Sequence, residues 1–370
     1  MDFTFSTEAD EAAALAAQIA GEKVTPERVR ELGTTPTPHH DPDLWQTLGQ
    51  AGLLGLAVPG EYGGAGLGLI EAARVVVELG RVVAPVPAAT HVAATVVLAE
   101  GARQQRIAEV LRSAADGSTL LTVALAEDFD HAPSRPETTA AESGADWMLH
   151  GAKTGARAGM EADAFLVPAQ TPTGTAVFLV HADDPGVTLD PERIIDGDTT
   201  ARLHLAGVRV PSDRLIGDAE GGTATRLAEL TTALTCAEQL GVCEGAIALT
   251  AQYAGEREQF GRPIGTFQAV SQRLADGYID TLGARLTLWQ ALWRLAEGLP
   301  ATVEVATAKL WAADAGHRIA HTCVHIHGGV GIDLDGTAHR YFTAAKRWEF
   351  AGGGTTEQAR RIGAVLAGQS

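Results

Sequence analysis

The chain has 370 residues, with 28 Lys and Arg against 46 Asp and Glu, a formal net charge of −18, and 45% of its residues are hydrophobic. So large an acidic excess leaves nothing to neutralise a phosphate backbone, and we expect no nucleic-acid partner. No apolar run approaches the roughly 20 residues that a membrane span needs, and the acidic N-terminus does not resemble a secretory signal, so we expect a cytoplasmic protein that does not bind membranes.

Helical, alanine-rich patterns occupy the first third of the chain. Residues 7–21 open with an acidic first turn, and apolar residues recur at three- and four-residue spacing in 69–84 and 93–114. The glycines and proline of 52–68 (GLLGLAVPGEYGGAGLG) interrupt regular structure between them. We predict an all-α domain over residues 1–119.

The pattern changes after residue 119. Short apolar runs, such as LLTVALAE, AFLVPAQ and TAVFLVH, are separated by clusters of Gly, Pro and Asp. Runs of this length and spacing are typical of an antiparallel sheet or barrel. We predict a β-barrel-like domain over residues 120–217.

Long helical patterns return in the last part of the chain. From residue 227 to 247 apolar residues are spaced for one helix face, and we expect further helices at 267–297, 301–322 and 355–367. The prediction is a four-helix bundle over residues 218–370 and an α+β fold overall. The three cysteines have no CxxC spacing, so we expect buried hydrophobic residues rather than a disulfide framework or a zinc site; they are Cys236, Cys243 and Cys323.

Four motifs in a fixed order point to one family. They are GLLGLAVPGEYGGAGLG at 52–68, GVRVPSDRLIG at 207–217, EREQFGRPIGTFQAV at 256–270 and HIHGGVGI at 325–332. Each motif is weak alone, but the combination resembles the acyl-CoA dehydrogenases over nearly the whole chain. The resemblance implies the helical, β and helical domains above, FAD as cofactor and an acyl-CoA substrate.

The third motif suits the outer half of FAD. A guanidinium at Arg257 is suited to the pyrophosphate, and the aromatic ring of Phe260 to the adenine. The resemblance assigns this loop to a flavin bound mainly by the neighbouring subunit. A surface network of Arg and Glu beside a buried Phe is the alternative. The predicted cofactor contacts are Arg257, Gln259, Phe260, Gln268, His325, Gly328 and Gly329.

The histidines of the fourth motif allow more than one interpretation. His317, His321 and His325 are spaced by four residues, so a metal site is conceivable, although no carboxylate or cysteine completes a ligand set. In the resembling family a glutamine stands where His325 stands here, and an imidazole still offers one hydrogen bond to the nucleotide. We therefore predict no metal, and weigh a flavin contact against simple packing.

The inner half of the flavin site departs from the family pattern. The family's Thr-Glu-Pro strand, followed by Gly-Ser-Asp, becomes ALAEDFDH here, with Ala126 at the threonine position. The strand that covers the flavin ring becomes KTGARAG, which places Gly155 to Ala158 where aromatic and hydroxyl groups are expected. A polar ring cannot be held without hydrogen-bond partners, so we predict that this chain's own flavin pocket is lost.

The catalytic base is also missing. The resemblance implies that a carboxylate removes the α-proton of the thioester while a hydride passes to the flavin. The two base positions known in the family fall on Gly353 and Thr231, and neither is acidic. The nearest other carboxylates are poorly placed by spacing; they are Glu229, Glu238, Glu349 and Glu357.

These departures predict a non-catalytic subunit of a heteromeric, FAD-dependent acyl-CoA dehydrogenase. The resemblance is to the β subunit of actinobacterial α2β2 enzymes, several of which act on CoA thioesters of steroid side chains. The partner would be a paralogous chain that carries the base, the flavin ring and most of the acyl-CoA site. Two rivals remain open: a self-sufficient homomeric flavoenzyme with a displaced base, and a redox-inert scaffold.

Overall fold

The computed structural model describes residues 4–34, 40–101, 104–132, 135–217, 219–334 and 336–368. It has the three parts expected from the sequence: a helical part, a β-sheet part and a second helical part. The division at 119/120 and 217/218 stays a prediction, and residue 218 lies outside the described residues.

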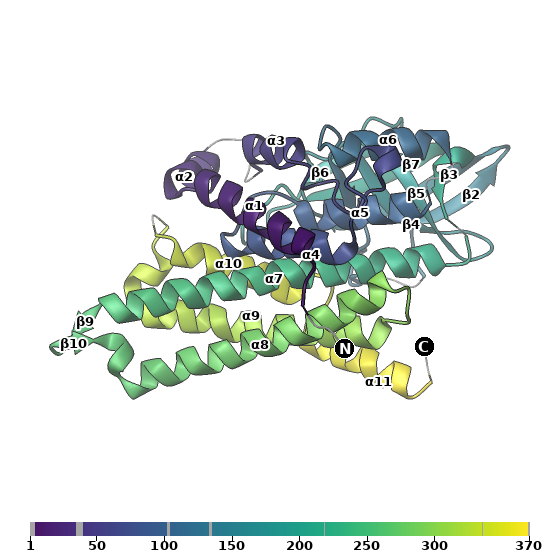
Figure 1. Cartoon of the computed structure of the whole chain (residues 1–370). Helices are drawn as coiled ribbons and strands as arrows, with labels where there is room; N and C mark the ends of the chain where they lie inside the picture. The colour runs from purple at the N-terminus through teal and green to yellow at the C-terminus, as the bar shows by residue number, and fades with distance from the viewer. Residues whose placement is uncertain are drawn as a thin grey trace.

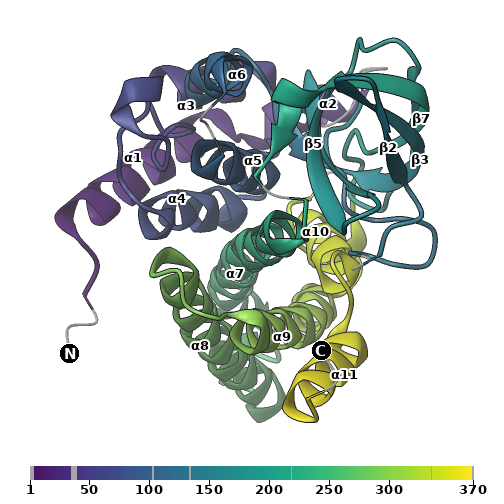
Figure 2. The same ribbon diagram turned by 90° about the vertical axis from the view of Figure 1, so that its right-hand side faces the viewer.

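The first part is a layer of helices. Helix α5 is buried on all sides, because every residue from Ala88 to Leu98 is shielded from solvent, and it packs between the sheet and the bundle (Figure 2). Its Thr90 faces a cavity described below. The elements are α1 (Thr7–Lys23), α2 (Pro26–Thr34), α3 (Pro42–Gln50), η1 (Gly60–Tyr62), α4 (Leu69–Arg81), α5 (Ala88–Glu100) and α6 (Gln105–Ala115).

The second part is one eight-stranded sheet in the order β6-β7-β3-β2-β4-β5-β8, with β1 beside β4. Its pairings are antiparallel, except that β4 lies parallel to β1 and to the start of β2. Strands β4 and β5 are buried almost end to end. The strands are β1 (Leu121–Val123), β2 (Thr139–Ser143), β3 (Asp146–Ala156), β4 (Ala164–Gln170), β5 (Thr175–His181), β6 (Val187–Pro191), β7 (Ala201–Pro211) and β8 (Leu215–Ile216).

The third part is a helical bundle, with α7 running across the middle of the molecule (Figure 1). The predicted helices are confirmed, and one of them continues beyond its expected end to His327. Helix α10 was not predicted as a separate element. The elements are α7 (Gly222–Glu256), β9 (Glu258–Gln259), β10 (Arg262–Pro263), η3 (Ile264–Thr266), α8 (Gln268–Ala296), α9 (Thr302–His327), η4 (Gly328–Ile332), α10 (Ala338–Phe350) and α11 (Thr355–Leu366).

Helix α7 is the common wall of the fold, because it packs against α4 and α5 on one side and α8, α9 and α10 on the other. Its crossing with α4 is close enough to require glycine. A Cβ on Gly241 would lie 2.0 Å from the Val77 carbonyl oxygen, and a Cβ on Gly80 would lie 2.3 Å from that of Glu238. The crossing therefore fixes where Glu238 sits relative to the N-terminal helices.

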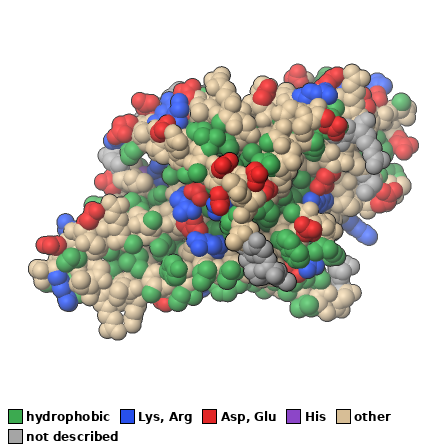
Figure 3. Space-filling view, viewed as in Figure 1, with side chains coloured by type: hydrophobic (Ala, Val, Ile, Leu, Met, Phe, Trp, Pro, Cys, Tyr) green, Lys and Arg blue, Asp and Glu red, His purple; other side chains and the backbone are tan. Residues whose placement is uncertain are grey.

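Helix α8 leaves an apolar face uncovered. The described exposed side chains along it are Tyr278, Ile279, Leu282, Leu286 and Trp293. In the space-filling view hydrophobic side chains gather over the bundle half of the molecule (Figure 3). A contiguous apolar surface of this kind is typical of a protein contact. No helix among the described residues is long and apolar enough to cross a membrane.

The α4–α7 crossing yields a prediction with a control in the same helix. Gly241→Ala should lower the free energy of unfolding by about 1–3 kcal/mol, because the added methyl group overlaps a backbone oxygen. Gly255→Ala should be neutral or stabilise by up to about 1 kcal/mol, since a Cβ there has nothing within 4 Å. Urea unfolding of both variants measures the difference, and an equal effect of the two would contradict the close crossing.

Candidate functional site

The predicted cofactor loop forms a tight hairpin at one end of the bundle (Figure 1). Strand β9 pairs with β10 across a two-residue turn, in which Phe260 and Gly261 have φ of 54° and 75°. Two successive positive φ angles are typical of a type I′ hairpin turn, which suits glycine but strains phenylalanine. The turn leaves Phe260 93% exposed.

The hairpin presents cations and rings together. The Arg262 guanidinium carbon lies 4.2 Å from the centre of the Phe267 ring, and the Phe260 ring meets Phe267 edge-on at 6.2 Å. Arg257 directly follows α7, and its exposed guanidinium makes no ion pair within the described part of the chain. The predicted alternative of an Arg–Glu network therefore does not form around Arg257 there. Gln268 is the exposed first residue of α8.

The fourth motif, at residues 325–332, lies at the same end of the bundle. The Tyr253 ring of α7 stacks on His327 of α9 at 4.3 Å between centres, which ties the two helix ends together. His325 is exposed, and Gly328 ends α9 with φ of 64°. Cβ atoms on Gly328 or Gly329 would meet nothing within 4 Å. This open, cationic and aromatic end fits the pyrophosphate and adenine of a dinucleotide, although the individual contacts stay predictions.

The place expected for the flavin ring holds an arginine instead. Arg157 follows β3 and is only 6% exposed. Its guanidinium forms a two-pronged ion pair with Glu238 of α7, in which Nη2 lies 2.8 Å from Oε1 and Nη1 contacts Oε2. Nη2 also donates to the Val86 carbonyl oxygen at 3.0 Å. The guanidinium carbon lies 4.7 Å from the centre of the Trp348 ring.

A second arginine extends this cluster. Asp198, in the loop between β6 and β7, accepts from Arg157 Nε at 3.2 Å and from Arg347 Nη1 at 2.6 Å, and Arg347 also contacts Asp196 at 2.9 Å. Burial would raise the pKa of the Asp198 carboxyl, but the guanidinium groups of Arg347 and Arg157 more than offset this and hold that pKa well below its usual range. Asp198 is therefore a carboxylate at neutral pH. We call Arg157, Asp198, Glu238 and Arg347 the arginine–carboxylate cluster.

The backbone near the expected ring position is also occupied. The N–H of Gly155 donates to Glu192 Oε2 at 2.7 Å, and the carbonyl of Ala126 accepts from the N–H of Thr154 at 2.9 Å. The N–H of Ala158 donates to Asp198 at 2.9 Å. These backbone groups and the arginine–carboxylate cluster are already hydrogen-bonded within the chain, which disfavours their use as partners of a flavin ring.

A cavity of about 690 Å³ remains beside the cluster. Thr231, Thr232 and Thr235 of α7 and Gly352 contribute to its wall. The hydroxyl of Thr231 donates to the Leu227 carbonyl within its own helix at 2.7 Å. Thr231 and Gly353 are the two predicted base positions, and neither supplies a carboxylate. The φ of 93° at Gly353 favours glycine there.

Three of the remaining carboxylates are held by other partners. Glu238 belongs to the arginine–carboxylate cluster, and Glu349 pairs with Lys346 at 2.8 Å and with His317 at 3.0 Å. Glu229 faces a different cavity.

Glu357 is different, because a Cβ on Gly353 would lie 2.6 Å from its Oε2, and its ion-pair contact among the described residues is with His131 at 3.9 Å. Glu357 is therefore the carboxylate that lies beside a vacant base position.

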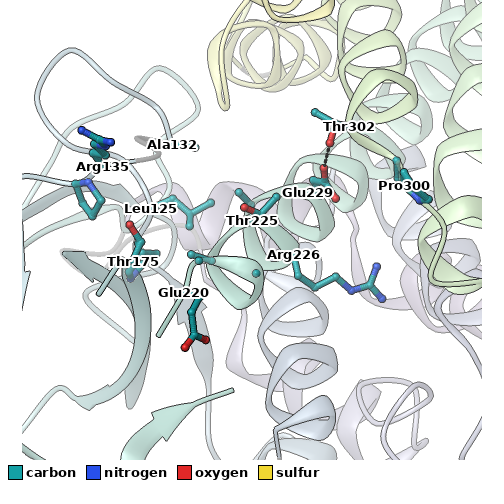
Figure 4. A pocket seen from close by; sticks show the side chains of 18 of the residues that line it. Leu125, Ala132, Arg135, Thr175, Glu220, Thr225, Arg226, Glu229, Pro300 and Thr302 are labelled. Atoms are coloured by element: carbon teal, nitrogen blue, oxygen red, sulfur yellow. Dashed lines mark hydrogen bonds between the residues drawn. The ribbon is translucent and has the colours of Figure 1, made fainter. Parts of the chain in front are cut away.

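A larger cavity of about 1280 Å³ lies between the sheet and the bundle (Figure 4). The start of α7, the β4–β5 connection and the α8–α9 connection line it. The Thr302 hydroxyl donates to Glu229 at 2.6 Å across its wall, as Figure 4 shows. The Arg226 guanidinium is paired with Glu100 and donates to the Leu295 carbonyl. Threonine hydroxyls, the Arg226–Glu100 pair and the side chains of Arg135 and Arg361 thus line this cavity.

The histidine ladder of α9 forms no metal centre that we identify. His317 and His321 lie 4.7 Å apart between ring centres, and His317 contacts Glu349. Across the described ranges no group of three His, Cys, Asp or Glu side chains is placed to hold a metal ion.

The arginine–carboxylate cluster is the feature that the sequence did not reveal. From the sequence, Gly155 to Ala158 show only the loss of the expected aromatic and hydroxyl groups. The carboxylate partners of Arg157 lie 41 and 81 residues away, so local sequence does not indicate them. The available signal was an arginine between alanines at the end of an apolar strand, which requires a distant partner when buried.

Comparisons with known proteins agree with the fold and the motifs. The family models for the N-terminal and C-terminal domains of acyl-CoA dehydrogenases match residues 6–118 and 223–366. The acyl-CoA dehydrogenase FadE27 of Mycobacterium tuberculosis is 46% identical, over 99% of both chains.

Two solved heteromeric assemblies contain similar chains. One is the ChsE4-ChsE5 complex from Mycobacterium tuberculosis, with a TM-score of 0.92, 47% identity and 99% coverage of both chains. The other is a variant of the Tcur3481-Tcur3483 steroid ACAD, with a TM-score of 0.92, 38% identity and 98% coverage of both chains.

The arginine–carboxylate cluster gives a stability prediction. Arg157→Met should lower the free energy of unfolding by about 3–5 kcal/mol, because it leaves Glu238 buried without its partner. Arg209→Met is the control, since its ion pair with Asp146 is exposed and should cost at most about 1 kcal/mol. Urea unfolding measures both, and a loss for Arg157→Met no larger than for Arg209→Met would refute the role of the cluster.

Proposed function

This chain belongs to the acyl-CoA dehydrogenase family, and we propose that it is the non-catalytic subunit of a heteromeric, FAD-dependent member. In this proposal the chain contributes contacts to a flavin whose ring lies in a partner subunit. The partner supplies the catalytic base and binds most of the acyl-CoA substrate.

One observation carries the proposal: the arginine–carboxylate cluster lies where the flavin ring is expected. Arg157 is bound there by Glu238, Asp198 and the Val86 carbonyl. Removing so many charge-assisted bonds to admit a ring would leave several buried charges unpaired, which is strongly unfavourable. The lack of a carboxylate at Gly353 and Thr231 supports the same conclusion, because proton abstraction needs a base.

The hairpin end is what the chain gives to the partner. FAD, when bound, supplies the acceptor for the hydride that leaves the thioester. Arg257 would bind the pyrophosphate through charge-assisted hydrogen bonds, and Phe260 would pack on the adenine. Gln259, Gln268, His325, Gly328 and Gly329 would complete this outer half of the site.

A heteromeric assembly is supported from two sides. Similar chains occur in the ChsE4-ChsE5 and Tcur3481-Tcur3483 complexes. The exposed apolar residues of α8 provide a surface that a partner would cover. We propose an α2β2 tetramer, in which each unlike pair shares one flavin.

The reaction of the complex would be α,β-dehydrogenation of an acyl-CoA thioester. The likeness to a steroid ACAD favours CoA esters of steroid side chains. Arg226 lines the chain's own large cavity. Its guanidinium is paired with Glu100, so it is not free to bind a phosphate of the substrate.

The two rival functions are less well supported. A homomeric enzyme with a displaced base needs a free carboxylate near the cavity, and Glu238 and Glu349 are both in ion pairs. Glu357, beside Gly353, is the carboxylate that this rival would use. The chain presents the exposed Arg257 and, at a strained turn, the exposed ring of Phe260. A redox-inert scaffold has no use for either group.

Arg257→Ala tests the proposal in the complex with the proposed paralogous partner. Loss of a charge-assisted contact worth roughly 1.5–3 kcal/mol should weaken FAD binding about 10- to 150-fold. The loss should appear in the partner's dehydrogenase activity, and excess FAD should restore much of the rate. Fluorescence titration of the apo-complex with FAD measures the affinity.

Arg273→Ala serves as the matched control, because Arg273 is an exposed arginine on the adjoining α8. It should leave FAD affinity within twofold of the wild type. Wild-type FAD affinity in the Arg257→Ala complex would rule out the proposed sharing of the flavin.

A further inference from the structure

Three exposed apolar side chains surround the mouth of the 690 Å³ cavity. They are Phe129 from the β1–β2 connection, Ile195 from the β6–β7 connection and Phe350 from the end of α10, with exposures of 108%, 57% and 58%. All three line the same cavity, although they come from three separate segments. An apolar rim of this kind is typical of a surface that another protein covers.

Phe129 is held in an unfavourable conformation at this rim. It has φ of 68°, in the left-handed region that phenylalanine seldom adopts. The turn is closed by two hydrogen bonds, from Glu127 N–H to the Asp130 carbonyl at 2.9 Å and from Asp130 N–H to that of Glu127 at 3.2 Å. The strain therefore presents the ring to solvent rather than burying it.

The turn is anchored from beneath by ion pairs. Glu127 accepts from the buried Lys153 at 2.7 Å, and Asp128 takes both arms of Arg202 at 2.9 and 2.7 Å. Asp130 keeps an exposed carboxylate that accepts from the Ala132 N–H. The rim thus combines a fixed aromatic ring with negative charge.

The hairpin of β9 and β10 presents a second exposed phenylalanine of this kind. Among the described residues only Val83, Phe129, Ala158 and Phe260 are non-glycine residues with positive φ, and the two phenylalanines are the ones that lie exposed. Phe260 stands between Arg257 and Arg262, whereas Phe129 stands between Asp128 and Asp130. The two sites are therefore alike in presenting a strained, exposed ring. The Asp130 carboxylate beside Phe129 is opposite in sign to Arg257 and Arg262, and Glu258 also lies on the hairpin.

We propose that the turn formed by Asp128, Phe129 and Asp130 is the docking site for the partner subunit's own arginine–aromatic hairpin. The inference rests on the proposed function. Two chains of like fold paired about a pseudo-twofold axis make reciprocal contacts. If this chain's hairpin reaches the flavin site of the partner, then the partner's hairpin reaches the equivalent place here, which is the mouth of the 690 Å³ cavity.

In the proposed function no flavin lies at this place, so protein groups would meet the incoming hairpin. The exposed Asp130 carboxylate offers its arginine the negative charge that a pyrophosphate would supply, whereas Asp128 is already bound by Arg202. The Phe129 ring offers its aromatic residue a surface in place of adenine. The turn is thus a substitute, made of protein, for the outer half of a flavin.

The test uses the complex of this chain with its paralogous partner. Phe129→Gly removes the ring and relieves the positive φ, so the isolated chain should melt at the same temperature or higher. Its dissociation constant for the partner should nevertheless rise at least tenfold. Asp130→Arg should also weaken association at least tenfold, with a loss that shrinks at high salt. Analytical ultracentrifugation of labelled chains measures both.

Two controls match these changes. Leu366→Gly removes an exposed apolar side chain at the end of α11, and Asp183→Arg reverses an exposed charge on the β5–β6 connection. Both should stay within twofold of the wild-type dissociation constant. The flavin content of every assembled complex should be unchanged, since the flavin lies at the other hairpin.

Two outcomes separate this inference from the function on which it rests. Wild-type association of both Phe129→Gly and Asp130→Arg would overturn the docking site while leaving the non-catalytic role intact. A wild-type chain that forms no complex with a paralogue and binds one FAD by itself would overturn both.

Discussion

The guanidinium of Arg157 meets carboxylates from two other parts of the chain, Glu238 on α7 and Asp198 beyond β6. It also reaches the Val86 carbonyl ahead of α5 and stacks on Trp348 of α10. The sheet, the N-terminal helices and the bundle therefore meet at one side chain. Because each buried charge needs its partners, the arrangement of the three parts depends on this cluster.

In the proposed function, the same cluster accounts for how one fold takes a different role. A flavin enzyme places a ring between sheet and bundle, and the proposal gives that position to Arg157 and its partners. The hairpin of β9 and β10 lies at the far end of the bundle (Figure 1), and its Arg257 and Phe260 are exposed. Loss of the inner half of a site and retention of the outer half is what a subunit needs if it assists a flavin held elsewhere.

Much of the fold followed from local pattern, and much of the site did not. Apolar spacing predicted α8 and α9 closely, because long amphipathic helices carry a strong periodic signal. The parallel pairing of β4 with β1 had no such signal, since strand order depends on long-range packing. Motif spacing located the vacancy at Gly353, but the partners of Arg157 are distant in sequence and become apparent only in three dimensions.

The number of flavins in the assembled complex tests the central claim most directly. Native mass spectrometry of the complex formed with the partner chain would count FAD and both kinds of subunit in one particle. If the arginine–carboxylate cluster has replaced the ring in this chain, the count should be one FAD for each pair of unlike chains, hence two in an α2β2 tetramer. A flavin for every chain, four in the tetramer, would contradict it.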